Sequence, residues 1–316
     1  MKSISEKIRN EAKKLLEEKR VDFLIGFEKG SVPLRQRPCF INNPADTEKL
    51  IWDSFCLQNL ATYLPRYKDT EKKIGIIAKG CDTRSIVCLI LENQIKRENL
   101  FIIGVPCNGM VSKRKIEEEF GEVLQAEDMG EEILIKTKEK EKRIKKKDYL
   151  MSTCLGCRHH NPVIYDILVG EEVKEPEGDG YDDIREFEKK EPEERWRFFE
   201  KEMEKCIRCY ACREACPSCY CEECFVDSTN PVWVSKGLDL SDLMIWQLTR
   251  VYHQAGRCVD CGSCEAACPV GVKLTWLTRK VNLIVKERFG FVTGLSTEEP
   301  APLATFKIED PQEFIM

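Results

Sequence analysis

The apolar and charged residues of the first hundred positions alternate in a way that predicts one surface helix and three buried strands. Residues Met1–Arg20 carry apolar side chains at helical spacing between charges, which is typical of an amphipathic helix. Three short runs rich in β-branched residues read as buried strands, and they cover Val21–Gly26, Lys73–Ala78 and Leu100–Val105. Helical stretches separate these runs, so the first half of the chain is predicted to be an α/β layer.

The second strand is followed by a glycine-containing turn. The turn, Lys79–Ser85, leads into an apolar helical segment that extends to Lys96. A strand-to-helix turn of this kind offers backbone amides to anions and ligands. Further on, Ile133–Lys136 is predicted to be another strand, and the lysine-rich run Thr137–Asp148 a solvated hairpin or loop.

The second half changes composition at an acidic stretch. Glu171–Lys205 is interrupted by proline and glycine, which predicts a linker followed by a charged helix around Glu193–Glu204. Beyond it we expect a cysteine-rich module closed by an amphipathic helix, Val272–Phe289, and an irregular tail that drapes over a partner or a domain. The expected units are residues 1–170, an α/β domain; 171–205, the linker and helix; 206–290, a ferredoxin-like domain; and 291–316, the tail.

Composition narrows the class of protein. The 316 residues carry 50 basic and 55 acidic side chains, a net charge of −5, without the basic excess of a nucleic-acid binder. The longest apolar stretches fall far short of the roughly 20 residues that cross a bilayer. The N-terminus lacks the apolar run of a signal peptide, so a cytoplasmic location with reduced thiols is expected. Eighteen cysteines beside three histidines are therefore predicted to be metal ligands rather than a disulfide scaffold.

One cysteine pattern occurs twice and ends in Cys-Pro both times. The first run is Cys206-x2-Cys209-x2-Cys212-x3-Cys216, and the second is Cys258-x2-Cys261-x2-Cys264-x3-Cys268. Each is a bacterial ferredoxin signature, in which the fourth cysteine of a run ligates the other cluster. We therefore assign Cys206, Cys209, Cys212 and Cys268 to one 4Fe-4S cluster, and Cys258, Cys261, Cys264 and Cys216 to a second. Zinc is the alternative, but four-cysteine zinc sites usually use two C-x2-C pairs.

The segment between the two runs holds three more cysteines. Cys219, Cys221 and Cys224 either ligate a further site or are loop and packing cysteines, and the second interpretation is favoured because no fourth ligand is evident. The helical stretch Asp239–His253 is expected to pack against the clusters, where dry packing tunes their potential.

A second group of cysteines is spread along the first half. Cys81 and Cys107 each follow a predicted strand, and Cys154-x2-Cys157 lies in a loop. If the strands are neighbours in one sheet, their ends and the loop converge on one edge and bring four thiolates together. The alternative is that Cys81 and Cys107 are small core residues and that only Cys154 and Cys157 bind metal.

These stretches carry a family resemblance. AKGCDTRSI, IGVPCNGM and CLGCRHHNPVIYDILVGEE together resemble the iron-sulfur flavoprotein β subunits of deazaflavin (coenzyme F-420)-dependent hydrogenases and formate dehydrogenases. The resemblance covers about residues 21–172, and the ferredoxin module covers most of the rest. It implies an FAD and one 4Fe-4S cluster in the first domain, with Cys81, Cys107, Cys154 and Cys157 as ligands. It also implies a catalytic partner subunit of a formate dehydrogenase, hydrogenase or heterodisulfide-reductase type, and a soluble two-electron carrier.

No G-x-G-x-x-G follows a strand, so an FAD needs other contacts. The candidates lie in the turn after the second strand, where amides and basic side chains suit a pyrophosphate: Lys79, Gly80, Asp82, Arg84 and Ser85. Ordinary surface charge is the alternative for Lys79 and Arg84, and Arg35 and Arg37 have a weaker claim. His159 and His160 are expected to be polar neighbours rather than ligands. No catalytic constellation for hydrolysis occurs.

The sequence thus predicts an oxidoreductase subunit with three 4Fe-4S clusters and an FAD. The FAD would exchange two electrons with a soluble carrier (a deazaflavin coenzyme, a nicotinamide or a ferredoxin), and the clusters would relay single electrons to the catalytic partner. The alternative is a flavin-free iron-sulfur adaptor that only wires and docks partner subunits. Lys79–Arg84 favours it, because the family usually has Gly-Thr-Pro-Cys-Gln-Ile there.

Overall fold

The structure, a computed structural model, describes residues 3–306 and 308. Its centre is a five-stranded sheet of order β2-β1-β3-β4-β8. Strands β1, β3, β4 and β8 run parallel, and β2 pairs antiparallel with β1 at one edge. The strands are β1 (Phe23–Val32), β2 (Arg35–Ile41), β3 (Ile74–Ala78), β4 (Leu100–Gly104) and β8 (Ile167–Leu168). The three predicted strands are confirmed.

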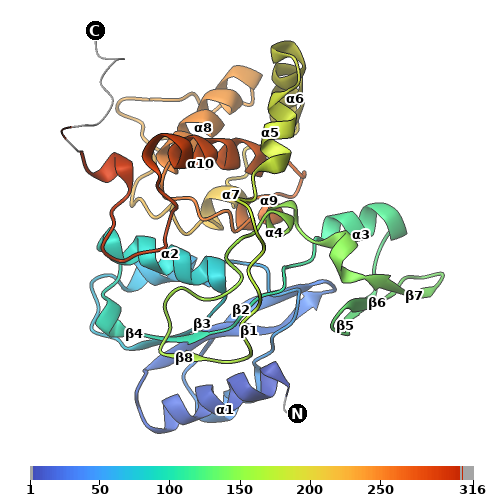
Figure 1. The fold of residues 1–316 in the computed structure, drawn as a ribbon, viewed down its shortest axis with the longest axis vertical. Coiled ribbons are helices and arrows are strands. Elements are labelled where there is room, and N and C mark those ends of the chain that lie inside the picture. The colour runs from blue at the N-terminus through green and yellow to red at the C-terminus, as the bar shows by residue number, and fades with distance from the viewer. Residues whose placement is uncertain (1–2, 307, 309–316) are drawn as a thin grey trace.

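Helices cover both faces of this sheet (Figure 1). Below it, α1 (Ile4–Glu17) buries Ile8, Ala12, Leu15 and Leu16 against the sheet, which confirms the amphipathic helix within the described residues. Above it lie α2 (Gly80–Leu91) and the 3-10 segment Leu60–Tyr67. The helix after the turn ends at Leu91 instead of Lys96, because Asn93 takes a left-handed φ of 54°.

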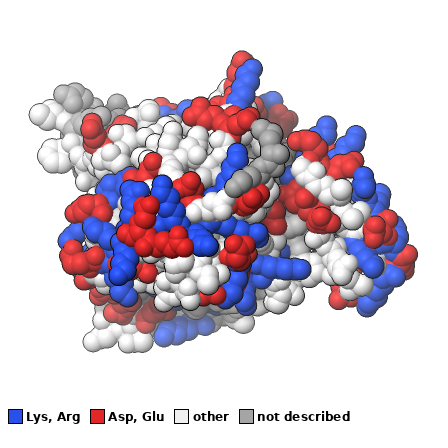
Figure 2. All heavy atoms as spheres, turned by 90° about the horizontal axis from the view of Figure 1, so that it is seen from below, with Lys and Arg blue, Asp and Glu red and all other residues white. Residues whose placement is uncertain are grey.

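A small lobe projects from the side of the α/β layer. It consists of α3 (Lys113–Phe120) and the antiparallel strands β5 (Gln125–Asp128), β6 (Glu132–Lys136) and β7 (Glu141–Lys145). The lysine-rich run therefore forms a solvated hairpin, as predicted, with only Ile144 of β7 buried. Seen from the α1 side, Figure 2 shows blue and red side chains intermingled over this face of the protein.

The second half forms a helical layer above α2 (Figure 1). The charged helix is α6 (Pro192–Glu204), and the stretch before it holds a short helix that the sequence pattern did not predict, α5 (Asp182–Glu188). The module continues with α7 (Ala211–Glu214), α8 (Leu240–His253), α9 (Ser263–Ala267) and α10 (Thr275–Phe289). The remaining short elements are α4 (Ser152–Leu155) and the 3-10 turns Pro44–Lys49, Arg97–Asn99, Lys146–Tyr149 and Pro302–Ala304.

Hydrogen bonds between distant parts of the chain join the two halves. The Arg84 guanidinium donates to the Thr293 carbonyl through Nε and Nη2 at 2.9 and 2.8 Å, and to the Val259 carbonyl at 3.2 Å. The start of the predicted tail is thus fixed on the first domain, while residues 307 and 309–316 lie outside the described part. The domain boundaries remain a prediction. None of the helices in the described ranges is long and apolar enough to cross a membrane.

Candidate iron-sulfur sites

The first ferredoxin run gathers around a loop between α6 and α7. Burial raises the pKa of the thiols of Cys206 and Cys212, and the charge of Cys268 raises both further. Cys268 lies at the end of α9, in the other run, and the Val272 N–H donates to its sulfur at 3.3 Å. The structure therefore places Cys268 beside the first run, as the crossed assignment requires.

The second run gathers in the same crossed way. Burial raises the pKa of Cys258 first, and the charges of Cys261 and Cys264 raise it further. A hydrogen bond with Cys219 and burial raise the pKa of Cys216, and the charge of Cys264 adds to them. The last cysteine of the first run thus lies with the second run.

The cysteines of the α/β domain lie at one edge of the sheet. Ala78 and Gly104 are paired residues at the carboxyl ends of β3 and β4. Directly beyond these ends come Cys81, in the first turn of α2, and Cys107. The edge predicted from the two strands therefore forms.

The CLGC loop completes this group. The pKa of Cys154 is raised to about 12 by burial, with the charges of Cys107 and Cys157 adding to it. Backbone N–H groups donate to sulfur at all three positions: Gly109 to Cys107 at 3.4 Å, Met110 to Cys154 at 3.3 Å and His159 to Cys157 at 3.5 Å. Such bonds favour the thiolate, the form that binds iron, so this donor set fits an iron–sulfide cluster.

The three groups follow one another through the molecule. Burial raises the pKa of the Cys81 thiol, and the charges that also act on it include those of Cys107, in its own group, and Cys261, in the second ferredoxin run. Likewise the charge of Cys212 acts on Cys264. The α/β group is therefore next to the Cys258 group, which is next to the Cys206 group.

The cysteine groups are not arranged to hold a single metal ion. Within residues 3–306 and 308, no three His, Cys, Asp or Glu side chains close around one metal ion. A cubane is a larger body than one ion and holds its four thiolates further apart.

The five candidate flavin contacts are enclosed by protein. Lys79 is 1% exposed and Asp82 fully buried; the Lys79 Nζ lies 3.0 Å from both carboxylate oxygens of Asp82 and 2.9 Å from the Gln58 carbonyl. Burial raises the pKa of Asp82, and the Lys79 charge opposes this shift. The Lys79 amine and the Asp82 carboxylate therefore form their ion pair with each other, and neither group is exposed to a ligand.

The other three candidates are equally engaged. The Arg84 guanidinium is committed to the carbonyls of Thr293 and Val259, and the Ser85 hydroxyl accepts from the Asn59 amide at 2.9 Å. Gly80 lies beneath the carbonyl of His159. The residues 79–85 therefore do not fit an FAD: the helix begins at Gly80 rather than after the turn, and other segments cover it.

Gly80 gives a direct test of this packing. A Cβ there would lie 2.3 Å from the His159 carbonyl oxygen, too close to be accommodated. We expect Gly80→Ala to cost about 1–3 kcal/mol and to displace the CLGC loop, so that iron analysis shows a loss of about four iron atoms per chain. Gly121→Ala is the control: its φ is 74° and no atom lies within 4 Å, so only strain of about 1 kcal/mol and no iron loss should appear. Full iron in Gly80→Ala would contradict this packing.

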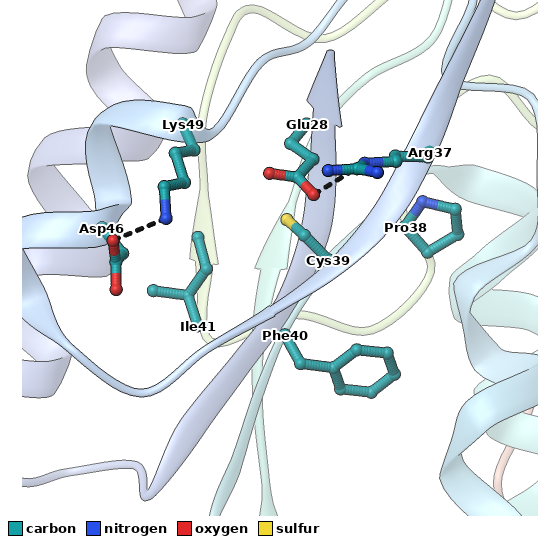
Figure 3. A pocket seen from close by; sticks show the side chains of 8 residues that line it. All are labelled: Glu28, Arg37, Pro38, Cys39, Phe40, Ile41, Asp46 and Lys49. Carbon is teal, nitrogen blue, oxygen red and sulfur yellow. Dashed lines mark hydrogen bonds and ion pairs between the residues drawn. The ribbon is translucent and has the colours of Figure 1, made fainter. Parts of the chain in front are cut away.

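The weaker flavin candidates lie elsewhere. Arg35 donates to the Ala266 carbonyl at 2.8 Å, across the contact between the two halves. Arg37 lines a pocket of about 450 Å³ between β1, β2 and the turn Pro44–Lys49 (Figure 3). Its guanidinium pairs with Glu28 at 2.8 Å, and Lys49 pairs with Asp46 at 2.7 Å on the opposite side. The charges of this pocket neutralise one another.

The histidines support the CLGC loop. His160 Nδ1 lies 2.6 Å from the Cys107 carbonyl oxygen, and the backbone N–H of His160 donates to Glu175. The pKa of His159 is lowered to about 4, first by burial and then by the charge of Arg84. The His160 ring thus contacts the backbone of Cys107, and His159 reaches Cys157 through its backbone N–H. That neither histidine is a ligand stays a prediction.

The three extra cysteines have different surroundings. Cys219 lies against Cys216, and this hydrogen bond lowers the pKa of Cys219. Cys221 is exposed, whereas Cys224 packs with the core around Trp246. Cys221 is therefore a loop cysteine and Cys224 a packing cysteine, whereas Cys219 contacts a proposed ligand, Cys216.

Sequence reasoning missed the polar face of α8. The sequence predicts dry packing of this helix against the clusters, but Gln247, Arg250 and Gln254 are buried and face the cysteines. The signal is present in the sequence as three polar residues at intervals of three and four, on the face that also carries the buried Leu243, Trp246 and Val251.

Comparison with known proteins agrees with this geometry. Residues 202–272 match the family described as the 4Fe-4S dicluster domain. The second half therefore contains a dicluster iron-sulfur domain within a mixed α/β protein.

The whole chain is similar to two curated proteins. The F420-dependent formate dehydrogenase subunit beta of Methanocaldococcus jannaschii is 28% identical, covering 94% of this chain and 93% of that protein. The F420-dependent formate dehydrogenase 1 subunit beta of Methanococcus maripaludis is 25% identical, covering 92% and 91%. The resemblance seen in the cysteine motifs is thereby confirmed. A solved F420-reducing nickel–iron hydrogenase complex from Methanosarcina barkeri matches 50% of this chain and 62% of the solved chain at 17% identity with a TM-score of 0.38, too low to compare the folds.

Proposed function

We propose that this protein is the electron-transfer subunit of a cytoplasmic oxidoreductase complex. It would relay single electrons through three 4Fe-4S clusters to a catalytic partner subunit of formate dehydrogenase, hydrogenase or heterodisulfide-reductase type. The observation that carries this proposal is the order of the three cysteine groups, in which the charge of Cys261 acts on Cys81 and the charge of Cys212 acts on Cys264. The two curated relatives, which are beta subunits of formate dehydrogenases, support a catalytic partner of that type.

The ligand sets follow from the groups. The α/β domain would hold one cluster with Cys81, Cys107, Cys154 and Cys157. The helical module would hold two, with Cys258, Cys261, Cys264 and Cys216, and with Cys206, Cys209, Cys212 and Cys268. Such clusters supply reversible one-electron chemistry when bound. The chain half-buries most of these cysteines, buries Cys212 and donates backbone N–H groups to several of the sulfurs. Such contacts are among the means by which a protein tunes these sites.

Apolar side chains mark the two ends of this series. Leu155 lies between Cys154 and Cys157 and is 57% exposed; Ile207 lies between Cys206 and Cys209 and is 53% exposed. Cys209 is itself exposed, whereas Cys212 is buried. An exposed apolar residue among the ligands of a terminal site suits the docking of a redox partner, so electrons would enter at one end and leave at the other.

Ile207→Glu tests the end at Cys209. A carboxylate in an apolar contact costs desolvation energy and repels a negatively charged redox site, so we expect electron transfer to the partner to slow by about tenfold. Iron content and reduction by a small-molecule donor should stay normal. Leu124→Glu, at a 43% exposed position beside the small lobe, is the matched control. Equal rates in the two variants would place the docking face elsewhere.

The FAD implied by the resemblance remains a prediction. The buried and paired residues of 79–85 support the second candidate function, the flavin-free adaptor, in which the α/β domain holds its cluster and docks partners. Denaturing anaerobically prepared, iron-loaded protein and measuring the released flavin decides between them. About one FAD per chain would support exchange of two electrons with a soluble carrier, with contacts outside 79–85. No flavin beside full iron would leave the one-electron relay alone.

A further inference from the structure

Helix α8 presents a buried polar face to both ferredoxin-type cysteine groups. Gln247, Arg250 and Gln254 are 1%, 4% and 3% exposed. Residues separated by three and four positions share one side of a helix. A polar stripe on the inner side of a helix needs polar partners, since unpaired buried groups are costly.

The partners of the two glutamines are cysteine sulfurs. Gln247 Nε2 lies 4.0 Å from the sulfurs of both Cys206 and Cys212, which belong to one group. Gln254 Nε2 lies 3.2 Å from the sulfur of Cys216, which belongs to the other. Each glutamine side chain therefore contacts the sulfurs of a different cysteine group.

Arg250 lies between these two glutamines along the helix. Its Nη2 donates to the Cys212 carbonyl at 3.1 Å, whereas Nε and Nη1 have no oxygen acceptor within the described chain. The guanidinium also acts on the Cys219 thiol, whose pKa is lowered first by the hydrogen bond with Cys216 and then by the charge and a hydrogen bond of Arg250. No carboxylate in that part of the chain forms an ion pair with it. The negative charges that act on Arg250 come from Cys216, Cys212, Cys219 and Cys264, so they come from both groups.

A buried guanidinium without a counter-charge costs several kcal/mol. A Cys219 thiolate can supply one negative charge, and two thiolate-ligated clusters would add more. Each cluster becomes more negative by one charge when it accepts an electron, and a fixed positive charge nearby stabilises that reduced form. Because Arg250 lies on α8 between Gln247 and Gln254, which contact the sulfurs of the two groups, both clusters would share its positive charge.

We propose that the positive charge of Arg250 raises the reduction potentials of both clusters of the helical module. Gln247 and Gln254 each tune the potential of one of these clusters. The inference rests on the proposed function, because it requires the two clusters. The step itself moves one electron from one reduced cluster to its oxidised neighbour, and no bond is formed or broken. Hydrogen bonds to sulfur and net charge are the protein's main influences on such potentials.

Redox titration of the complete, iron-loaded protein monitored by electron paramagnetic resonance tests the arginine. Arg250→Met removes the charge at similar volume and should lower the reduction equilibrium constant of both clusters about tenfold, which is about 59 mV for one electron. Arg250→Lys keeps the charge and should retain most of the potential. Lys280→Met on α10, which removes a cation paired with Glu188, is the matched control and should change neither. Unshifted potentials in fully loaded Arg250→Met would overturn the inference.

The glutamines provide the test if Arg250→Met does not fold. Gln247→Met should shift only the cluster of the Cys206 group, and Gln254→Met only that of the Cys216 group, each by about threefold, as the loss of one hydrogen bond would give. Selective shifts support the inference, while absent or identical shifts overturn it. Iron analysis separates the two proposals: wild-type protein without clusters contradicts the proposed function, whereas loaded variants with unmoved potentials contradict only this inference.

Discussion

Lys79→Met is expected to destabilise the protein by about 3–5 kcal/mol, the usual cost of removing one partner of a buried ion pair. The substitution leaves the Asp82 carboxylate fully buried without its counter-charge, since both its oxygens lie 3.0 Å from the Lys79 Nζ. The Gln58 carbonyl also loses its donor. Denaturant unfolding monitored by circular dichroism measures the change.

The double variant Lys79→Met/Asp82→Asn is the control. It removes both charges. In the wild-type protein the backbone N–H of residue 79 donates to Asp82 Oδ2 at 3.2 Å, and the asparagine amide oxygen can still accept this hydrogen bond. We expect it to recover much of the lost stability, because the cost comes from the orphaned carboxylate rather than from the missing amine. A stable single variant that has lost flavin would show instead that the Lys79 amine serves a ligand.

Cys268→Ala is expected to remove the cluster of the other cysteine run. Cys268 follows Cys264 in sequence but lies beside Cys206 and Cys212. The crossed assignment therefore predicts a fall from about 12 to about 8 iron atoms per chain, with loss of the cluster that Cys206, Cys209 and Cys212 hold. Iron analysis and electron paramagnetic resonance of the reduced protein measure both effects.

Two variants make this result specific. Cys216→Ala should remove the other cluster of the module, whereas Cys221→Ala, at an exposed cysteine outside all three sets, should keep full iron. If Cys268→Ala abolished the signal of the Cys258 group instead, each run would serve its own cluster and the crossed arrangement would be wrong.

The sequence was sufficient to predict the buried strands and the cysteine groups that depend on neighbouring residues in the chain. The runs that became β3 and β4 are buried and β-branched, and parallel strands must end at one edge, so the sequence was enough to bring Cys81 and Cys107 to that edge. The spacing of the ferredoxin runs likewise predicted the two groups of the helical module. That module matches a known dicluster family over residues 202–272.

The rest depends on contacts between distant segments. Lys79 and Arg84 read as surface cations at an anion-binding turn, yet both are buried. Lys79 pairs with Asp82 and the Gln58 carbonyl, and Arg84 donates to the Thr293 carbonyl at the start of the tail. A sequence pattern records polarity but not what packs over it. Arg250 shows the same limit, because a buried arginine is expected only where the surroundings supply negative charge.

A relay of three one-electron centres has a fixed electron capacity, and coulometric reduction of the purified, iron-loaded protein measures that capacity. We expect about three electrons to be taken up per chain, one for each cluster, with about two more only if an FAD is also bound. An uptake of about two electrons with about 8 iron atoms per chain would contradict it, because the cysteines at the sheet edge would then hold no cluster.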